Sequence, residues 1–134
     1  MILYKHLMLV AGLSHREAAA FHDVRLDTIR SWSINRNPAP EGVINELTEL
    51  IDRMLTAVDQ AMSAIEDQHT SPTVIELGSC SDDKEAQDLG WPCASVHHHV
   101  IGLIAAQCLH IGHTVEVVPR GSTIASAAAI EAHE

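Results

Sequence analysis

The chain has 134 residues, the size of one ordinary domain or two small ones. No apolar run approaches the roughly 18 residues of a membrane span, and the first residues lack the charged start and long apolar stretch of a signal peptide. Three cysteines without framework spacing indicate reduced thiols. We therefore expect a cytoplasmic protein that does not enter a membrane.

The net charge of −10 argues against a nucleic-acid partner, but the charge is unevenly distributed. Residues 1–36 hold five Lys or Arg against three Asp or Glu, a net charge of +2. Residues 37–134 hold three against fifteen, a net charge of −12. This asymmetry points to a charged partner at the basic end, and the small surplus there favours binding by a dimer at two sites.

The first two helices have clear boundaries in the sequence. Apolar residues at helical spacing predict a helix over residues 2–11, which Gly12 ends. Ser14 and Glu17 then form the capping-box pattern, in which each side chain satisfies a free backbone N–H group of the other residue. The second helix should end at Asp23, because Asp tolerates the left-handed conformation that a helix end needs.

A third short helix follows the turn, with its apolar side chains on one face. Ile29 and Trp32 share this face, and Thr28 lies beside them. The other side carries Arg25, Leu26, Asp27, Arg30 and Ser31. Arg can make two hydrogen bonds to a guanine edge, Asp can accept one from cytosine, and an apolar side chain can contact a thymine methyl group. The pattern is therefore typical of a helix that reads the major groove.

This pair of helices resembles the helix-turn-helix of the Cro/C1-type repressors. The resemblance covers about the first half of the chain, and the matching residues are Leu13, Ser14, Glu17, Ala19, Val24, Thr28, Ile29 and Trp32. The chain departs from the family pattern at Asp23, Ser33 and Asn35, which replace a turn Gly, a Glu and a later Gly. The alternative is an ordinary pair of helices with a buried Trp.

The helix-turn-helix interpretation assigns a role to each exposed polar residue. We expect bases to be read by Arg25, Leu26, Asp27 and Arg30. We expect phosphates to be contacted by Arg16, Ser31, Asn35, Arg36 and Asn37. A homodimer would place two such helices in successive major grooves of double-stranded DNA, on the half-sites of an inverted repeat about 10 bp apart.

After the extended segment at Pro38 and Pro40, apolar residues at spacings of three and four predict a long helix over about residues 41–67. Its apolar stripe is longer than a small helical domain can cover. The helix could span both halves of the chain or pair with a second subunit. Alternatively, it is a solvated amphipathic helix on one monomeric core.

The second half has the pattern strand, loop, helix, strand. We expect strands over residues 73–77 and 113–118, a helix over residues 95–111, and a loop with at most one short helix over residues 79–90. Gly78 should end the first strand and Gly112 the helix. The sequence thus predicts an α+β fold, with a helix-turn-helix domain (1–67), a β-α-β dimerisation domain (72–120) and a tail (121–134).

Two strands make an unstable sheet, but pairing across a two-fold axis would give four strands. The segment from Val100-Ile101-Gly102 to Gly112-His113, a long helix that leads into a strand, resembles the C-terminal dimerisation domain of the anti-CRISPR-associated repressors. This second resemblance covers about 25 residues. It implies that the C-terminal half joins two subunits.

The histidines do not have the spacing of a metal site. His97, His98 and His99 point about 100° apart on a helix, and His99 and His110 lie three turns apart. No C-x₂-C or H-x₃-H spacing occurs, so we expect surface or interface histidines and no metal or other cofactor. At a dimer interface, their protonation near pH 6 would loosen the dimer.

The sequence therefore predicts a DNA-binding repressor that regulates its own operon. It contains no P-loop and no G-x-G-x-x-G motif, and nothing at recognisable spacing would complete a Cys93–His97 nucleophile pair, so we expect no enzyme. Two alternatives remain. One is the antitoxin of a toxin–antitoxin pair, and the other is a ligand-sensing or catalytic C-terminal domain that uses the histidines.

Overall fold

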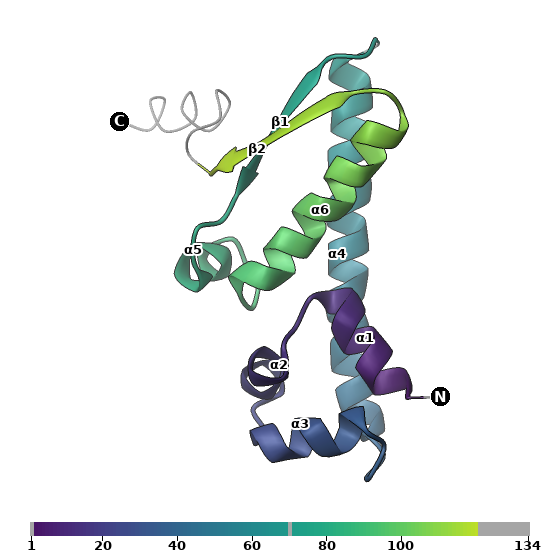
Figure 1. Cartoon of the computed structure of the whole chain (residues 1–134), viewed down its shortest axis with the longest axis vertical. Helices are drawn as coiled ribbons and strands as arrows, with labels where there is room; N and C mark the ends of the chain where they lie inside the picture. Colours follow the sequence, from purple (N-terminus) through teal and green to yellow (C-terminus); the bar gives the residue numbers. More distant parts are fainter. Residues whose placement is uncertain (1, 70, 121–134) are drawn as a thin grey trace. The chain divides into compact units, whose positions relative to one another are not determined.

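The computed structural model describes residues 2–69 and 71–120, and its fold is α+β, as predicted (Figure 1). Its elements in chain order are α1 (Leu3–Ala11), α2 (His15–His22), α3 (Leu26–Ser33), α4 (Glu41–Gln68), β1 (Val74–Ser79), α5 (Asp83–Asp88), α6 (Ala94–His110) and β2 (Thr114–Pro119). Backbone contacts divide the chain between Leu55 and Thr56 into two compact parts, which we call the N-terminal unit and the C-terminal unit. The tail predicted for residues 121–134 lies outside the described residues.

Local sequence signals determine the helix ends of the N-terminal unit. Gly12 ends α1 in the left-handed conformation, with φ 77°. The capping box is present, because the Ser14 hydroxyl accepts the Glu17 N–H at 3.1 Å and the Glu17 carboxylate accepts the Ser14 N–H at 2.9 Å. Asp23 ends α2 with φ 56°, and Asn35 follows α3 with φ 59°. These predicted helix boundaries are confirmed.

The core of the N-terminal unit contains buried side chains from α1, α3 and α4. Ile29 and Leu47 are fully buried, and Trp32 is 7% exposed. Tyr4 and Met54 complete this core from α1 and α4. The predicted inward face of α3 is therefore confirmed.

Helix α4 confirms the long helix predicted for residues 41–67, and it contributes to both units. Its buried side chains recur every three or four residues, at Leu47, Leu50, Met54, Val58 and Met62. The division into units thus falls inside the helix, whereas the sequence places the domain boundary after residue 67. The helical period continues across the division, so no break in the pattern marks it.

The C-terminal unit is a two-stranded parallel sheet covered by α6. The strands pair in register from Val74↔Thr114 to Ser79↔Pro119. Parallel strands need a crossover connection, which α5 and α6 supply. One face of α6, which packs against both strands, buries Val96, Val100, Ile104 and Cys108 at intervals of four residues.

All four strand ends differ from the prediction by one or two residues, since the strands cover Val74–Ser79 and Thr114–Pro119 rather than residues 73–77 and 113–118. Gly78 does not end β1, because it pairs with Val118 inside the sheet. β2 begins at Thr114, so His113 precedes the strand, and its side chain is buried. The helix predicted for residues 95–111 is α6, which Ile111 caps ahead of Gly112, and α5 is the short helix allowed within residues 79–90.

Within the described ranges, no helix combines the length and the apolarity that a membrane span requires.

Replacing Ser14 by Ala should remove the cap of α2 and lower the free energy of unfolding of the N-terminal unit by about 1 kcal/mol. Urea unfolding followed through the indole N–H signal of Trp32 measures this unit. Ser14→Thr keeps a hydroxyl acceptor and serves as the control. Equal urea midpoints for Ser14→Ala and the wild type would contradict the role of the cap.

Candidate nucleic-acid interface

The turn between α2 and α3 is held by backbone hydrogen bonds. The Val24 N–H donates to the Ala19 carbonyl at 3.0 Å, and the Asp23 N–H donates to the Ala20 carbonyl at 3.3 Å. Arg25 precedes α3 as its N-cap, but its side chain makes no capping hydrogen bond. The turn therefore leaves the Arg25 guanidinium exposed at the start of α3.

The structure separates the two sides of α3 as the helical spacing predicts. Ile29 and Trp32 are buried, whereas Arg25, Asp27 and Arg30 are exposed. Two of the residues predicted to face outward, Leu26 and Ser31, are partly buried. The outward side of α3 thus presents two guanidinium groups and one carboxylate.

Asp27 and Arg30 lie one turn apart on this outward side. The Arg30 Nη1 is 3.7 Å from the Asp27 Oδ1, and their side chains are 59% and 88% exposed. Exposed ion pairs of this kind contribute between about 0 and 1 kcal/mol. Because the ion pair is weak, it can break, and each group can then form hydrogen bonds with a ligand. The Arg30 guanidinium has five N–H donors for such bonds.

Four of the five predicted phosphate contacts gather at the end of α3. The Asn37 side-chain amide donates to the Ser31 hydroxyl at 2.8 Å, and the Arg36 N–H donates to the Ser31 carbonyl at 2.9 Å. Asn35 lies within the same turn, where its positive φ reverses the chain. Arg16 lies apart from this group, exposed on the first turn of α2.

A shallow hollow lies between α3 and the segment that follows it. Its lining contains Asp27, Thr28, Ser31, Trp32, Arg36 and Asn37. Thr28 was not among the predicted site residues, because helical spacing placed it beside the buried face. Its position in the sequence, between the exposed Asp27 and the buried Ile29, could have indicated that Thr28 lies at the edge of the exposed face. The hollow brings one predicted base-reading residue, Asp27, next to three predicted phosphate-contacting residues.

An aromatic cluster from three helices holds α3 in place. Trp32 packs edge-on against Tyr4 of α1, with ring centroids 5.5 Å apart at 70°. The His22 ring of α2 lies 6.1 Å from Trp32 and 5.8 Å from Tyr4. The position of Trp32 therefore depends on the rings of Tyr4 and His22. The direction of the outward side of α3 depends on the same contacts.

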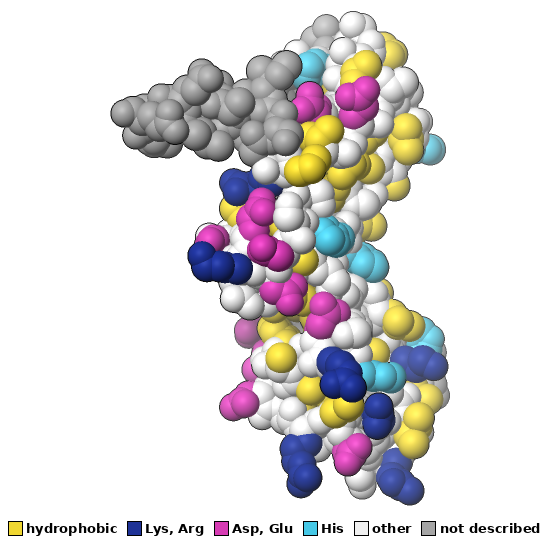
Figure 2. Space-filling model, turned by 60° about the vertical axis from the view of Figure 1, so that its left-hand side comes forward, with side chains coloured by type: hydrophobic (Ala, Val, Ile, Leu, Met, Phe, Trp, Pro, Cys, Tyr) yellow, Lys and Arg dark blue, Asp and Glu magenta, His cyan; other side chains and the backbone are white. Residues whose placement is uncertain are grey.

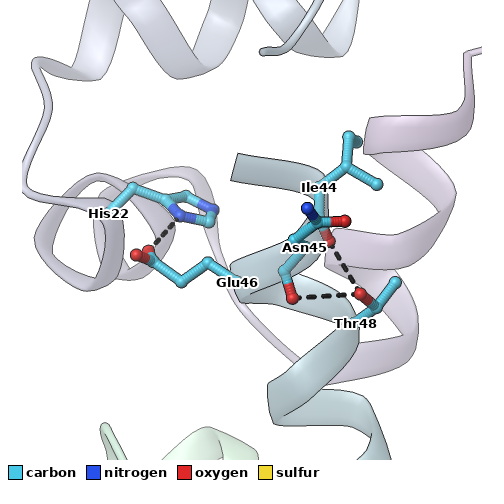
Figure 3. Close-up of polar contacts among 5 residues, drawn as sticks. All are labelled: His22, Ile44, Asn45, Glu46 and Thr48. Carbon is cyan, nitrogen blue, oxygen red and sulfur yellow. Dashed lines mark hydrogen bonds and ion pairs between the residues drawn. The ribbon is translucent and has the colours of Figure 1, made fainter. Parts of the chain in front are cut away.

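A buried histidine connects this cluster to α4 (Figure 3). The His22 side chain is fully buried, and its Nδ1 donates to the Glu46 Oε1 at 2.7 Å. Two residues further along α4 in the same view, the Thr48 hydroxyl donates to the carbonyls of Ile44 and Asn45, each at 3.0 Å. Sequence reasoning treated His22 only as a helix end, because nothing in the local pattern points to a partner 24 residues away.

The Tyr4 hydroxyl lies inside the cluster in its neutral form. Burial, and secondarily the negative charge of Glu46, raise the pKa of Tyr4 to about 12. The Tyr4 hydroxyl and the His22 Nε2 are both buried and have no hydrogen-bond partner among the described residues. The cluster is therefore an apolar anchor with a single strong polar link, the one between His22 and Glu46.

The histidines of the C-terminal unit are arranged differently from the prediction. In the described ranges, no group of three His, Cys, Asp or Glu side chains is placed to hold a metal ion. His97 was expected at a surface or an interface, but it is buried and accepts the Cys80 N–H at its Nδ1. His98 and His99 are exposed, so the prediction is wrong for the first histidine of the three. His97 is buried because it lies beside the apolar face of α6, next to the buried Val96.

No protein-family model matches the chain, and no curated protein is significantly similar to it. The candidate interface therefore depends on the geometry and chemistry of its own residues.

Replacing Glu46 by Ala should leave the buried His22 N–H without its acceptor and lower the free energy of unfolding of the N-terminal unit by about 1–3 kcal/mol. Glu49→Ala, at an exposed position one turn along α4, should change it by less than about 0.5 kcal/mol. Urea unfolding followed at Trp32 compares the two variants. The anchor would be refuted by equal midpoints for both.

Proposed function

We propose that this chain is a sequence-specific DNA-binding transcriptional repressor, which binds an inverted repeat as a homodimer and regulates its own operon. The observation that carries the proposal is the two-sided character of α3. Its apolar side is buried around Ile29 and Trp32, while Arg25, Asp27 and Arg30 extend into solvent. The resemblance to the Cro/C1-type and anti-CRISPR-associated repressors supports the same function.

The proposed reading of bases uses the first two turns of α3. Arg25 and Arg30 would each donate two hydrogen bonds to a guanine edge, and Asp27 would accept one from a cytosine amine. Leu26 would contact a thymine methyl group. Because an exposed carboxylate is repelled by phosphates, Asp27 also favours a position that faces bases over one that faces the backbone.

The proposed phosphate contacts surround this reading surface. Asn35 and Arg36 are exposed at the end of α3, and the hydrogen bond between Ser31 and Asn37 orders that end. Arg16 would contact the backbone from the start of α2, where helix N-termini favour anions. Such contacts position a protein on a duplex without reading its sequence.

The distribution of charge is compatible with specific binding by two copies. On the face that Figure 2 draws, dark blue Lys and Arg side chains are frequent on the N-terminal unit, and magenta Asp and Glu side chains are frequent on the C-terminal unit. A net charge of +2 over residues 1–36 supports only modest affinity for phosphates. A homodimer doubles the contacts, and the acidic remainder of the chain disfavours binding to arbitrary DNA.

The C-terminal unit is the proposed dimerisation domain. A sheet of two strands is marginally stable by itself, and each strand leaves one edge of backbone N–H and C=O groups unpaired within the described sheet. Pairing with a second copy would give four strands. The proposal requires this dimer to place its two α3 helices in successive major grooves, on half-sites about 10 bp apart.

Footprinting of the full chain on the DNA upstream of its own gene tests the proposal, together with the mass of the protein and of its complex in solution. We expect protection of an inverted repeat and two chains per site. A monomer that protects no segment of this DNA would overturn the proposal.

Replacing Arg30 by Ala should weaken binding to the protected site by about 1–3 kcal/mol per half-site and relax specificity at one base pair, because a bidentate contact to a base is lost. Fluorescence anisotropy with labelled duplexes measures the loss. Lys84→Ala on α5 removes the same charge far along the chain and is the control. If Arg30→Ala and Lys84→Ala bind equally well, Arg30 does not read a base.

A further inference from the structure

Strand β1 is held at both of its ends by histidine rings. Thr73, which precedes β1, donates its backbone N–H to the His113 Nδ1 at 3.1 Å. Cys80, which follows β1, donates its backbone N–H to the His97 Nδ1 at 3.3 Å. Both histidines are 7% exposed, so water cannot readily replace these acceptors. His97 belongs to α6 and His113 immediately precedes β2, so each bond connects β1 to a neighbouring element.

Both hydrogen bonds require a neutral imidazole. A ring nitrogen can accept a hydrogen bond only through its lone pair, so Nδ1 must be unprotonated and the ring proton must lie on Nε2. Protonation of Nδ1 would place an N–H group against the backbone N–H of Thr73 or Cys80. It would also leave a positive charge in a buried position, which is costly without a partner.

The groups around His97 mostly oppose its protonation. Burial lowers the pKa of His97, and the positive charges of His98 on α6 and Arg120 after β2 lower it further, against a smaller opposite effect of Glu85 on α5. His98 also contacts Cys80, but through the Cys80 carbonyl, which lies 2.8 Å from the His98 Nε2. That bond needs only a donor and therefore survives protonation of His98.

His113 has its own polar surroundings at the other end of β1. The His69 ring at the end of α4 lies edge-on to it, with ring centroids 6.4 Å apart. Glu66 of α4 lines the same shallow hollow as His69 and His113. Glu66 therefore lies near the His113 ring, whose Nδ1 accepts the Thr73 N–H.

We propose that His97 and His113 form an acid-sensitive clasp, which holds β1 in the C-terminal unit at neutral pH and releases it in mildly acidic solution. This inference does not depend on the proposed function, because it concerns the folding of the C-terminal unit. The described part of the sheet has two strands, so β1 has one pairing partner to retain it when both end bonds are lost. The N-terminal unit should remain folded.

The direction of the pH dependence follows from the lowered pKa of His97. An unfolded histidine takes up its proton near pH 6.5, whereas the folded unit resists it. The stabilisation is therefore complete above about pH 6.5 and is lost as the pH falls below that value. Between pH 7.5 and 5.5, the folding equilibrium constant should fall by up to about tenfold because the fold opposes the protonation of His97.

The full-length chain offers one tryptophan in each unit as a probe. Urea unfolding at pH 7.5 and pH 5.5, followed through the indole N–H signals of Trp91 and Trp32, reports on the C-terminal and N-terminal units. We expect the folding constant measured at Trp91 to fall by up to about tenfold on acidification. We expect the constant measured at Trp32 to change much less. An unchanged constant at Trp91 would overturn the clasp.

Asparagine substitutions separate hydrogen bonding from titration. In His97→Asn and His113→Asn, the side-chain oxygen can accept the same backbone N–H but cannot be protonated. The His97→Asn variant should lose the pH dependence of up to about tenfold, and the double variant should lose any further dependence that comes from the His113 bond. His99→Asn, at the exposed neighbouring position on α6, should retain the full dependence. A double variant with the wild-type dependence would refute the proposal.

A measurement on the unmodified chain covers the case in which the variants do not fold. The ring ¹⁵N chemical shifts of His97 and His113 at pH 7.5 distinguish the two neutral tautomers. We expect protons on Nε2 in both rings. A proton on Nδ1 of both rings would overturn the proposal, because neither nitrogen could then accept the hydrogen bond that defines the clasp.

Discussion

The burial of Trp32 is the constraint on which the N-terminal unit depends. Its indole packs edge-on against Tyr4 and lies close to His22, and these three rings come from three different helices. A helix of eight residues is too short to be stable alone, so α3 takes its position from this contact. Because one side of α3 is committed to the core, Arg25 and Arg30 necessarily face solvent. The proposed reading surface is thus a consequence of how the core is packed.

The two units are stabilised by different kinds of interaction. The N-terminal unit uses local devices, such as the Ser14–Glu17 capping box and the left-handed Asp23, and adds long-range contacts through the Trp32 cluster and Glu46. The C-terminal unit depends on distant pairs, since β1 and β2 lie about 40 residues apart in the chain. Contacts over such separations cost loop-closure entropy, so a two-stranded sheet benefits from additional bonds at its ends. The rings of His97 and His113 provide them.

Most features of the candidate site were predictable, because they are local. Helical spacing placed Ile29 and Trp32 inside and Arg25, Asp27 and Arg30 outside, and this depends only on the period of 3.6 residues per turn. Ser31, Arg36 and Asn37 were each predicted to contact phosphates, and the structure brings them together because they lie within one turn and a chain reversal of each other. By contrast, the hydrogen bond of His22 could not be predicted, because its partner Glu46 follows 24 residues later on another helix.

By itself, the sequence determined the α+β class, the helix ends and the long helix α4, because caps, glycines and apolar periods act within a few residues of themselves. Only the tertiary structure decided which elements pack against one another and which residues they bury. It placed His97 in the core rather than on the surface, paired Gly78 inside the sheet, and divided α4 between two units. These outcomes depend on neighbours that are distant in the chain, and an apolar period that continues unchanged through α4 cannot reveal where one core ends and the next begins.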